Sequence, residues 1–367
     1  MIWVLMVIGA IAASVFGIAF LVMSIGKFGF FKKIGKENKF LKILLPLVVV
    51  VGVFGFFSYA MSVINAVVII VYITIFFLLS ELLAKIVSKI SGKKFSHYWQ
   101  GLLAIVCSVF YLVCGYYLCV NVVEKDYNLI TDKKVGTLKI AMFADSHIGA
   151  VFNGESFARQ LKVIEKQSPD ILIIPGDYVD DETKKSDMEA CCRALGEFKA
   201  RFGVYFAYGN HDEGYFNKRD FSAEDLRESL SKNGVHILED EAMLVDNRFY
   251  VVGRCDKSKI DRMSMDELLQ NVDNDKYIVV LDHEPNDYEN EALSDADLVV
   301  SGHTHGGQLI PITYIGQWLG FNDRTYGYEK RNKTDFIVTS GISDWAIKFK
   351  TGCRSEYVII NVNSLAD

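Results

Sequence analysis

The chain has 367 residues, of which 51% are hydrophobic and 23% are charged, and it contains 5 prolines and 28 glycines. This composition excludes a disordered or collagen-like chain. The charge is unevenly distributed, because residues 1–120 hold ten lysines and two acidic residues and carry +8, whereas the other 247 residues carry −14. A basic, apolar first third is therefore joined to an acidic part that is long enough to bury a core as one domain.

The first third contains three long runs without a charged residue, at 1–26, 43–80 and 101–123. About 20 apolar residues cross a bilayer as a helix, so the middle run of 38 residues is long enough for two spans. A turn near Ser58, Ser62 or Asn65 would divide it. We therefore predict an all-α transmembrane anchor of about four helices at residues 1–123, with spans at about 2–26, 41–60, 62–82 and 101–123.

Two lysine-rich segments set the expected orientation of this anchor. Six lysines lie between residues 27 and 42, and four lie between residues 85 and 94. Lysine is enriched in cytoplasmic loops, and both segments face the cytoplasm only if residues 43–80 form a hairpin. We therefore expect an integral, multi-pass protein of the cell membrane whose later domain is extracytoplasmic. The alternative, a cleaved signal peptide at residues 1–26, lacks the basic start that such a peptide needs.

After a polar stretch at residues 124–136, interpreted as a linker, residues 137–367 alternate short apolar runs with amphipathic segments. Helices are predicted at 155–167 and 182–199. Strands are predicted at 138–144, 170–175, 204–208, 235–238, 248–253, 277–281, 298–301, 336–339 and 357–362. The early alternation is typical of a parallel sheet covered on both faces, and the scarcity of helices after residue 238 indicates mixed or antiparallel pairing and a second sheet.

Polar clusters follow five of these predicted strands directly. They are Asp145-Ser146-His147, Gly176-Asp177-Tyr178-Val179-Asp180, Gly209-Asn210-His211-Asp212, Asp282-His283-Glu284-Pro285 and Gly302-His303-Thr304-His305. Ligands bind at the carboxyl ends of strands in α/β sheets, so these side chains can converge. Buried together, they would be costly unless a cation compensates them. Imidazole and carboxylate ligands suit a divalent metal, and the absence of cysteine from the clusters argues against a structural zinc site.

The order DxH, GDxxD, GNHD, HE and GHTH resembles the calcineurin-like metallophosphoesterases. The fuller forms "YGNHD", "DHEP" and "SGHTHGGQ" resemble the bacterial membrane-associated or exported phosphodiesterase branch of that family. The resemblance covers roughly residues 137–362, although Lys348 stands where the family pattern leads us to expect arginine. It implies an α/β fold, a four-layer αββα sandwich, for a metallophosphoesterase domain at residues 137–367.

The same resemblance implies a site with two divalent metal ions, such as Mn, Fe or Zn. Asp145, His147 and His305 would bind one ion. Asn210, His283 and His303 would bind the second, and Asp177 would bridge the two. A hydroxide between the ions would attack phosphorus. His211 would stabilise a phosphate oxygen or protonate the leaving group, with Asp180 orienting its ring and Asp212 as a second candidate for that task.

These expectations favour a membrane-anchored phosphodiesterase that acts on a phosphodiester or diphosphate, which could be lipid- or wall-linked. A phosphomonoesterase or protein phosphatase uses the same metals and is one alternative. A non-enzymatic, metal-binding membrane scaffold is the other. Nucleic acid is not expected as a partner, because the part after residue 120 carries −14 and has no lysine- or arginine-rich patch.

The stretch after the last cluster, residues 309–321, is unusually apolar and aromatic for a segment beside a proposed active site. The simpler interpretation is that it covers the edge of a sheet as ordinary core. The alternative is that it receives an acyl chain or enters the membrane interface.

Overall fold

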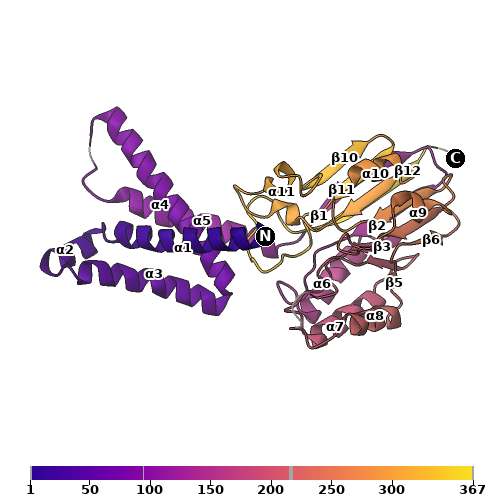
Figure 1. Cartoon of the computed structure of the whole chain (residues 1–367), viewed down its shortest axis with the longest axis horizontal. Coiled ribbons are helices and arrows are strands. Elements are labelled where there is room, and N and C mark those ends of the chain that lie inside the picture. The colour runs from indigo at the N-terminus through magenta and orange to yellow at the C-terminus, as the bar shows by residue number, and fades with distance from the viewer. Residues whose placement is uncertain (1, 94, 215–217, 366–367) are drawn as a thin grey trace. The chain divides into compact units, whose positions relative to one another are not determined.

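The computed structural model describes residues 2–93, 95–214 and 218–365, and the chain divides into two compact units. The first comprises Met1–Tyr116 with Ala346–Lys348, and the second comprises Tyr117–Trp345 with Phe349–Asp367. We call them the helical unit and the α/β unit, and each is described by itself (Figure 1).

The helical unit is built from α1 (Ile2–Ile25), α2 (Gly29–Glu37), α3 (Leu41–Ala60), α4 (Val63–Ser91) and the greater part of α5 (Trp99–Val120). Helices α3, α4 and α5 are each long and apolar enough to cross a membrane. A fourth candidate is the bent pair Ala12–Ile25 and Gly29–Lys36, whose axes differ by 79°. Ser62 accepts a hydrogen bond from the backbone N–H of Asn65 and so begins α4, which divides the long apolar run into two helices.

The two lysine-rich segments lie at the same end of the helical unit. Lys27, just after α1, forms an ion pair of 2.6 Å with Glu81 of α4. The Tyr98 hydroxyl, just before α5, donates to the same carboxylate at 2.7 Å. The rings of Phe28 and Tyr98 also pack together, with centroids 5.0 Å apart. The segments after α1 and before α5 are therefore neighbours, as a hairpin of α3 and α4 requires.

The α/β unit contains two mixed six-stranded sheets. The first has the order β1-β12-β2-β3-β4-β5, and its strands are β1 (Val123–Thr131), β12 (Glu356–Ser364), β2 (Thr137–Met142), β3 (Ile171–Pro175), β4 (Val204–Ala207) and β5 (His236–Ile237). The second has the order β10-β11-β9-β8-β7-β6, and its strands are β10 (Gly327–Arg331), β11 (Thr334–Val338), β9 (Leu298–Ser301), β8 (Tyr277–Leu281), β7 (Phe249–Gly253) and β6 (Glu241–Val245).

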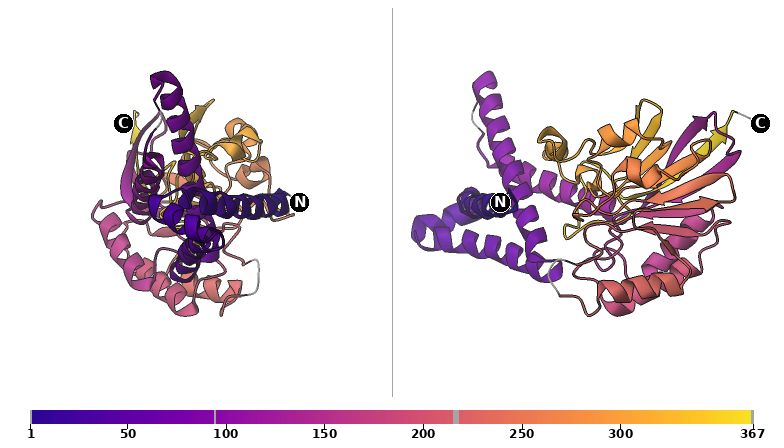
Figure 2. Two further views of the ribbon diagram at one scale, coloured as in Figure 1. Left: turned by 90° about the vertical axis from the view of Figure 1, so that its left-hand side faces the viewer. Right: turned by 45° about the vertical axis from the view of Figure 1, so that its right-hand side comes forward.

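Alternating side chains place these sheets between two helical layers. In β3, Leu172 and Ile174 pack toward α6 (Gly154–Glu165), α7 (Lys185–Gly196) and α8 (Ala223–Lys232), whereas Ile171 and Ile173 pack into the core between the sheets. The opposite face of the second sheet packs on α9 (Met265–Leu269) and α10 (Tyr288–Leu293). The unit is the expected αββα sandwich, with each helical layer on its own outer face (Figures 1 and 2).

The structure has a β-strand where a linker was expected. Most of residues 124–136 belongs to β1, which pairs in parallel with β12 from Val123 to Thr131. Only Leu129 of this strand is buried, because β1 is the edge of its sheet and exposes most of its side chains. An edge strand is held by backbone hydrogen bonds on one side and needs no apolar run, so its sequence is as polar as that of a linker.

Residues 309–321 also differ from the simpler expectation that they form core. This segment contains α11 (Ile315–Trp318), which has no buried residue, and most of its large apolar side chains are exposed. Leu309 and Thr313 alone among residues 309–321 are buried.

Candidate metal centre

The residues predicted from the five clusters lie on loops that follow β2, β3, β4, β8 and β9. Parallel neighbours among these strands bring their carboxyl ends to one edge, so the loops meet. The approach of two of the loops is close. A Cβ on Gly176 would lie 2.5 Å from the nitrogen of Gly209, and one on Gly209 would lie 2.4 Å from Asp177 Oδ1. Glycine is therefore needed at both positions.

Five of the predicted ligands have left-handed backbone conformations, with φ between 36° and 68°: Asp145, His147, Asp177, His303 and His305. Such conformations cost non-glycine residues on the order of 1–3 kcal/mol each and gather at functional sites. Here they turn successive side chains inward from short loops.

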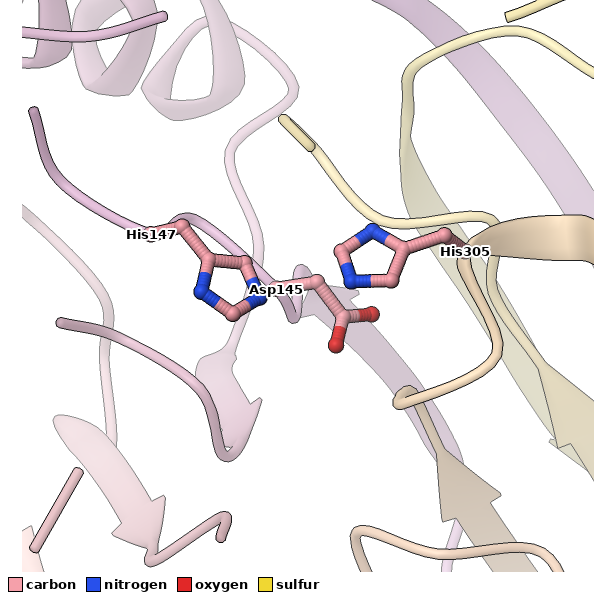
Figure 3. A group of neighbouring side chains, drawn as sticks. All are labelled: Asp145, His147 and His305. Carbon is pink, nitrogen blue, oxygen red and sulfur yellow. The ribbon is translucent and has the colours of Figure 1, made fainter. Parts of the chain in front are cut away.

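The first cluster consists of Asp145, His147 and His305, and one candidate ligand atom from each lies within 4.8 Å of the others. Figure 3 shows the two imidazole rings on either side of the Asp145 carboxylate, and the ring centroids are 5.1 Å apart. Asp145 and His147 are fully buried. One oxygen of Asp145, Oδ1, accepts the backbone N–H of His303 at 2.8 Å, which joins this cluster to the second.

The second cluster consists of Asp177, His283 and His303, with ligand atoms again within 4.8 Å of one another. Asn210 lies among them, because its Oδ1 is 3.1 Å from His283 Nε2 and 2.9 Å from His303 Nδ1. Asp177 lies between the clusters, with Oδ2 at 3.2 Å from His283 Nε2 and 3.5 Å from His147 Nε2. The structure thus brings together all seven residues that were predicted to bind metal.

The outward nitrogens of three rings face oxygen atoms. His283 Nδ1 donates to the carbonyl of Pro175 at 2.8 Å, and its other nitrogen, Nε2, faces the oxygen atoms of Asp177 and Asn210. His147 Nδ1 lies 3.5 Å from Asp180 Oδ2, and His305 Nδ1 lies 3.2 Å from Asp344 Oδ1. Such partners fix the tautomer and orientation of metal-binding histidines.

These residues fit divalent cations. Asp145 Oδ2 and His147 Nε2 are buried and have no hydrogen-bond partner among the described residues, which is costly for polar atoms unless something else binds them. Burial alone would lower the pKa of His283 and raise that of Asp177, but their mutual attraction raises the first and lowers the second. The carboxylate therefore carries negative charge at the junction of the two clusters. Imidazole nitrogens with carboxylate and amide oxygens suit Mn, Fe or Zn.

Asp180 was expected to orient the ring of His211. In the structure its carboxylate instead faces His147, one of the metal-ligand candidates. The ring of His211 packs against His147 and Trp345, with centroid distances of 5.0 and 5.3 Å. Its backbone N–H donates to Asp177 Oδ1 at 2.9 Å. Burial lowers the pKa of His211 to about 4.

Asp212 holds the loops together. Its buried carboxylate accepts backbone N–H groups of Asp177, Tyr178 and Val179 at 2.8–3.0 Å, and that of Gly209 at 2.8 Å. The aspartate of the GNHD motif therefore ties the loop after β3 to the loop after β4, which explains its place in the sequence without an acid–base role.

Sequence reasoning missed Asp344. This residue is 1% exposed, and burial raises its pKa to about 7 although Lys350 lowers it. Lys350 is itself buried and donates to the carbonyls of Ser340 and Gly341 at 2.5 and 3.3 Å. Asp344 lies five residues after the predicted strand at 336–339 and has no histidine near it in the sequence, so the pattern that marked the five clusters did not mark it.

Comparison with known proteins gives a consistent result. Residues 138–307 match the family model described as calcineurin-like phosphoesterase. An uncharacterized metallophosphoesterase of Aquifex aeolicus is 36% identical over 248 residues, which are 65% of this chain and 91% of the relative. An uncharacterized metallophosphoesterase of Campylobacter jejuni is 29% identical over 61% of this chain and 59% of the relative.

A transmembrane protein with metallophosphoesterase domain from Danio rerio is 27% identical over 60% of this chain. The match covers 52% of that relative, so the chain spans little more than half the length of the Campylobacter and Danio proteins.

Proposed function

The chain belongs to the calcineurin-like metallophosphoesterase family, and from this premise we propose that it is a membrane-anchored phosphodiesterase acting on a phosphodiester or diphosphate outside the cytoplasm. As a member of this family it is a hydrolase of phosphoric esters that uses two divalent metal ions. The preference for diesters, the ligand assignments and the orientation are our proposal.

The observation that carries the proposal is the position of Asp177. A single oxygen, Oδ2, lies within 3.5 Å of a histidine nitrogen from each cluster. We assign Asp145, His147 and His305 to one ion, Asn210, His283 and His303 to the other, and Asp177 to both. Two ions held there would activate a water molecule for attack on phosphorus and offset the charge of the phosphoryl oxygens.

His211 is the candidate for direct contact with the substrate. Its backbone N–H holds Asp177 Oδ1, and its ring lies against His147 and Trp345, so the side chain is fixed beside both clusters. From this position the imidazole, which its lowered pKa keeps neutral near pH 7, would donate an N–H hydrogen bond to a phosphoryl oxygen or to the leaving oxygen. Asp180 supports the reaction through His147, whose ring it orients.

The orientation follows from the two lysine-rich segments. They lie at the same end of the helical unit, where Lys27 and Tyr98 both bind Glu81. Lysine enrichment supports a cytoplasmic position for that end. A chain that begins α5 there and crosses once emerges on the opposite side, which supports a position of the α/β unit outside the cytoplasm. Reporter fusions after Val123 test this, because a cytoplasmic signal would contradict the four-span arrangement or its polarity.

The activity is tested with the full-length protein in detergent micelles. We expect Mn²⁺-dependent hydrolysis of an aryl phosphodiester that exceeds hydrolysis of the matching monoester, and its loss in Asp177→Asn. Cleavage of the monoester alone would replace the diesterase with a monoesterase. Absence of any hydrolysis while two Mn²⁺ ions bind would favour a scaffold or a highly specific substrate over a general diesterase.

A further inference from the structure

An exposed apolar surface lies on residues 309–321, which we call the apolar rim. Seven of its large apolar side chains are exposed, and Trp318 and Leu319 are 76% and 58% accessible. No charged residue occurs from Leu309 to Asn322. Elsewhere in the described part of the α/β unit, exposed large apolar side chains are scattered singly or in adjacent pairs. A concentrated patch of this kind marks an interaction site, whereas scattered residues need no explanation.

The apolar rim is held in place, so these side chains cannot simply fold inward. The N–H of Ile310 donates to Thr351 Oγ1 at 3.0 Å, and that of Thr351 donates to the carbonyl of Gln308 at 2.8 Å. Within the rim, the N–H of Phe321 donates to the carbonyl of Gly316 at 2.8 Å. The exposed side chains are therefore presented on an ordered loop.

Both ends of the apolar rim are joined to the loops that carry the metal-ligand candidates. The rim begins four residues after His305. Just beyond its other end, the N–H of Asp323 donates to the carbonyl of Pro285, two residues after His283. The Thr304 hydroxyl, between the last two histidines, donates to the carbonyl of Thr325 at 2.6 Å. The rim is thus part of the border of the site.

A lipid bilayer is the partner that these observations favour. Tryptophan and tyrosine beside isoleucine and leucine, without charge, form the composition that enters a membrane interface. A bilayer lies near the α/β unit wherever α5 spans a membrane, because α5 ends at Val120 and β1 begins at Val123. That connection reaches about 10 Å at most, so the α/β unit is held at the membrane surface wherever α5 spans.

We propose that the apolar rim inserts into the lipid interface and that the phosphoester cleaved at the neighbouring site is carried on a membrane lipid. The substrate half of this inference rests on the proposed function, whereas insertion of the rim does not.

Insertion is tested with the full-length protein in lipid nanodiscs made with and without brominated acyl chains. Brominated lipid should quench the fluorescence of Trp318, measured as the difference between the wild type and Trp318→Phe. The remaining three tryptophans are common to both proteins. An absence of Trp318 quenching would overturn the inference and would turn the search to a protein partner for the rim.

The substrate class is tested in the same nanodiscs with two diesters, a water-soluble aryl diester and a diacylglycerol phosphodiester with a fluorescent headgroup. Leu319→Ser should lower hydrolysis of the lipid diester about tenfold, because it removes apolar surface that would be buried in lipid, and should leave the soluble diester unchanged. Leu293→Ser is the matched control, because Leu293 is 74% exposed but lies beside acidic residues.

The outcomes separate the two proposals. Equal loss with both diesters would show that Leu319 supports the fold, and no loss with either would show that the rim does not deliver substrate, so each overturns the lipid assignment. Quenching of Trp318 without hydrolysis of any phosphoester would leave the membrane contact standing and refute the proposed function instead.

Discussion

The two clusters of the metal centre have the same number of histidines but different charge around them. In the first, His147 and His305 turn their outward nitrogens toward the carboxylates of Asp180 and Asp344. In the second, His283 turns its outward nitrogen toward a neutral carbonyl, and Asn210 contributes a neutral amide oxygen. Asp177 is shared.

Because of this difference, the two clusters would hold their ions with unequal affinity. Carboxylates behind a histidine raise the basicity of the ring as a ligand, and Asp145 adds a further negative charge to the first cluster only. The first cluster therefore suits a tightly held ion, and the second suits one that exchanges more readily. The shared carboxylate makes the pair depend on a single residue.

Replacement of Asp177 by asparagine should have the largest effect, because it removes the one ligand common to both clusters. We expect a loss of activity of about 10⁴-fold or more, beyond the usual worth of a single acid or base, and loss of paired metal binding measured by elemental analysis. Asp261→Asn, at an exposed aspartate of the same unit, is the control. Two ions retained in Asp177→Asn would refute the bridging role.

His211→Ala should come next, because His211 touches both clusters through its neighbours but is assigned to neither ion. Turnover should fall by about 10²–10⁴-fold, the usual contribution of a positioned acid, while two ions remain bound. His236→Ala, at a partly exposed histidine of β5, should leave both properties unchanged. Loss of an ion in His211→Ala would make this residue a ligand instead.

Much of this centre could be predicted from the sequence, for a physical reason. Asp145, Asp177 and His283 each follow a buried strand, so an apolar run points to each of them. Parallel pairing of β2 with β3 brings the first two to one edge, and His283 follows β8 of the second sheet. Asp344 has no such marker, because it reaches His305 from an irregular segment between β11 and β12. Asp344 could therefore be found only from a tertiary contact, whereas Asp180, which also faces a ligand candidate, lies in one of the predicted clusters.

Strand prediction from the sequence was limited in a similar way at the edges of the two sheets. The three strands that the sequence did not indicate, β1, β6 and β10, are all edges of their sheets. In β1 and β10 charged residues replace the apolar alternation that marked the central strands, whereas β6 exposes the adjacent apolar residues Met243 and Leu244 and so lacks that alternation as well. The prediction for the apolar rim was wrong in the opposite sense, because its apolar run was expected to be buried and is exposed.

Asp344→Asn should weaken metal binding at the first cluster without changing the second. Loss of the partner of a ligating histidine typically costs about 10–100-fold in metal affinity, and here the loss should fall on the ion of the first cluster alone. Mn²⁺ titration of the chelated full-length protein measures this. Asp335→Asn is the matched control, because Asp335 is also buried but contacts Tyr328 and Lys330 instead of a ligand candidate.

The smallest effect concerns the unmodified protein. Titration of the chelated wild type with Mn²⁺ should resolve two steps whose dissociation constants differ by about tenfold or more, because the tighter ion has the additional carboxylates around it. In Asp344→Asn the tighter step should move toward the weaker one, so that the two steps merge. A single step in the wild type, or a shift of the weaker step in the variant, would mean that the carboxylates behind His147 and His305 do not distinguish the clusters.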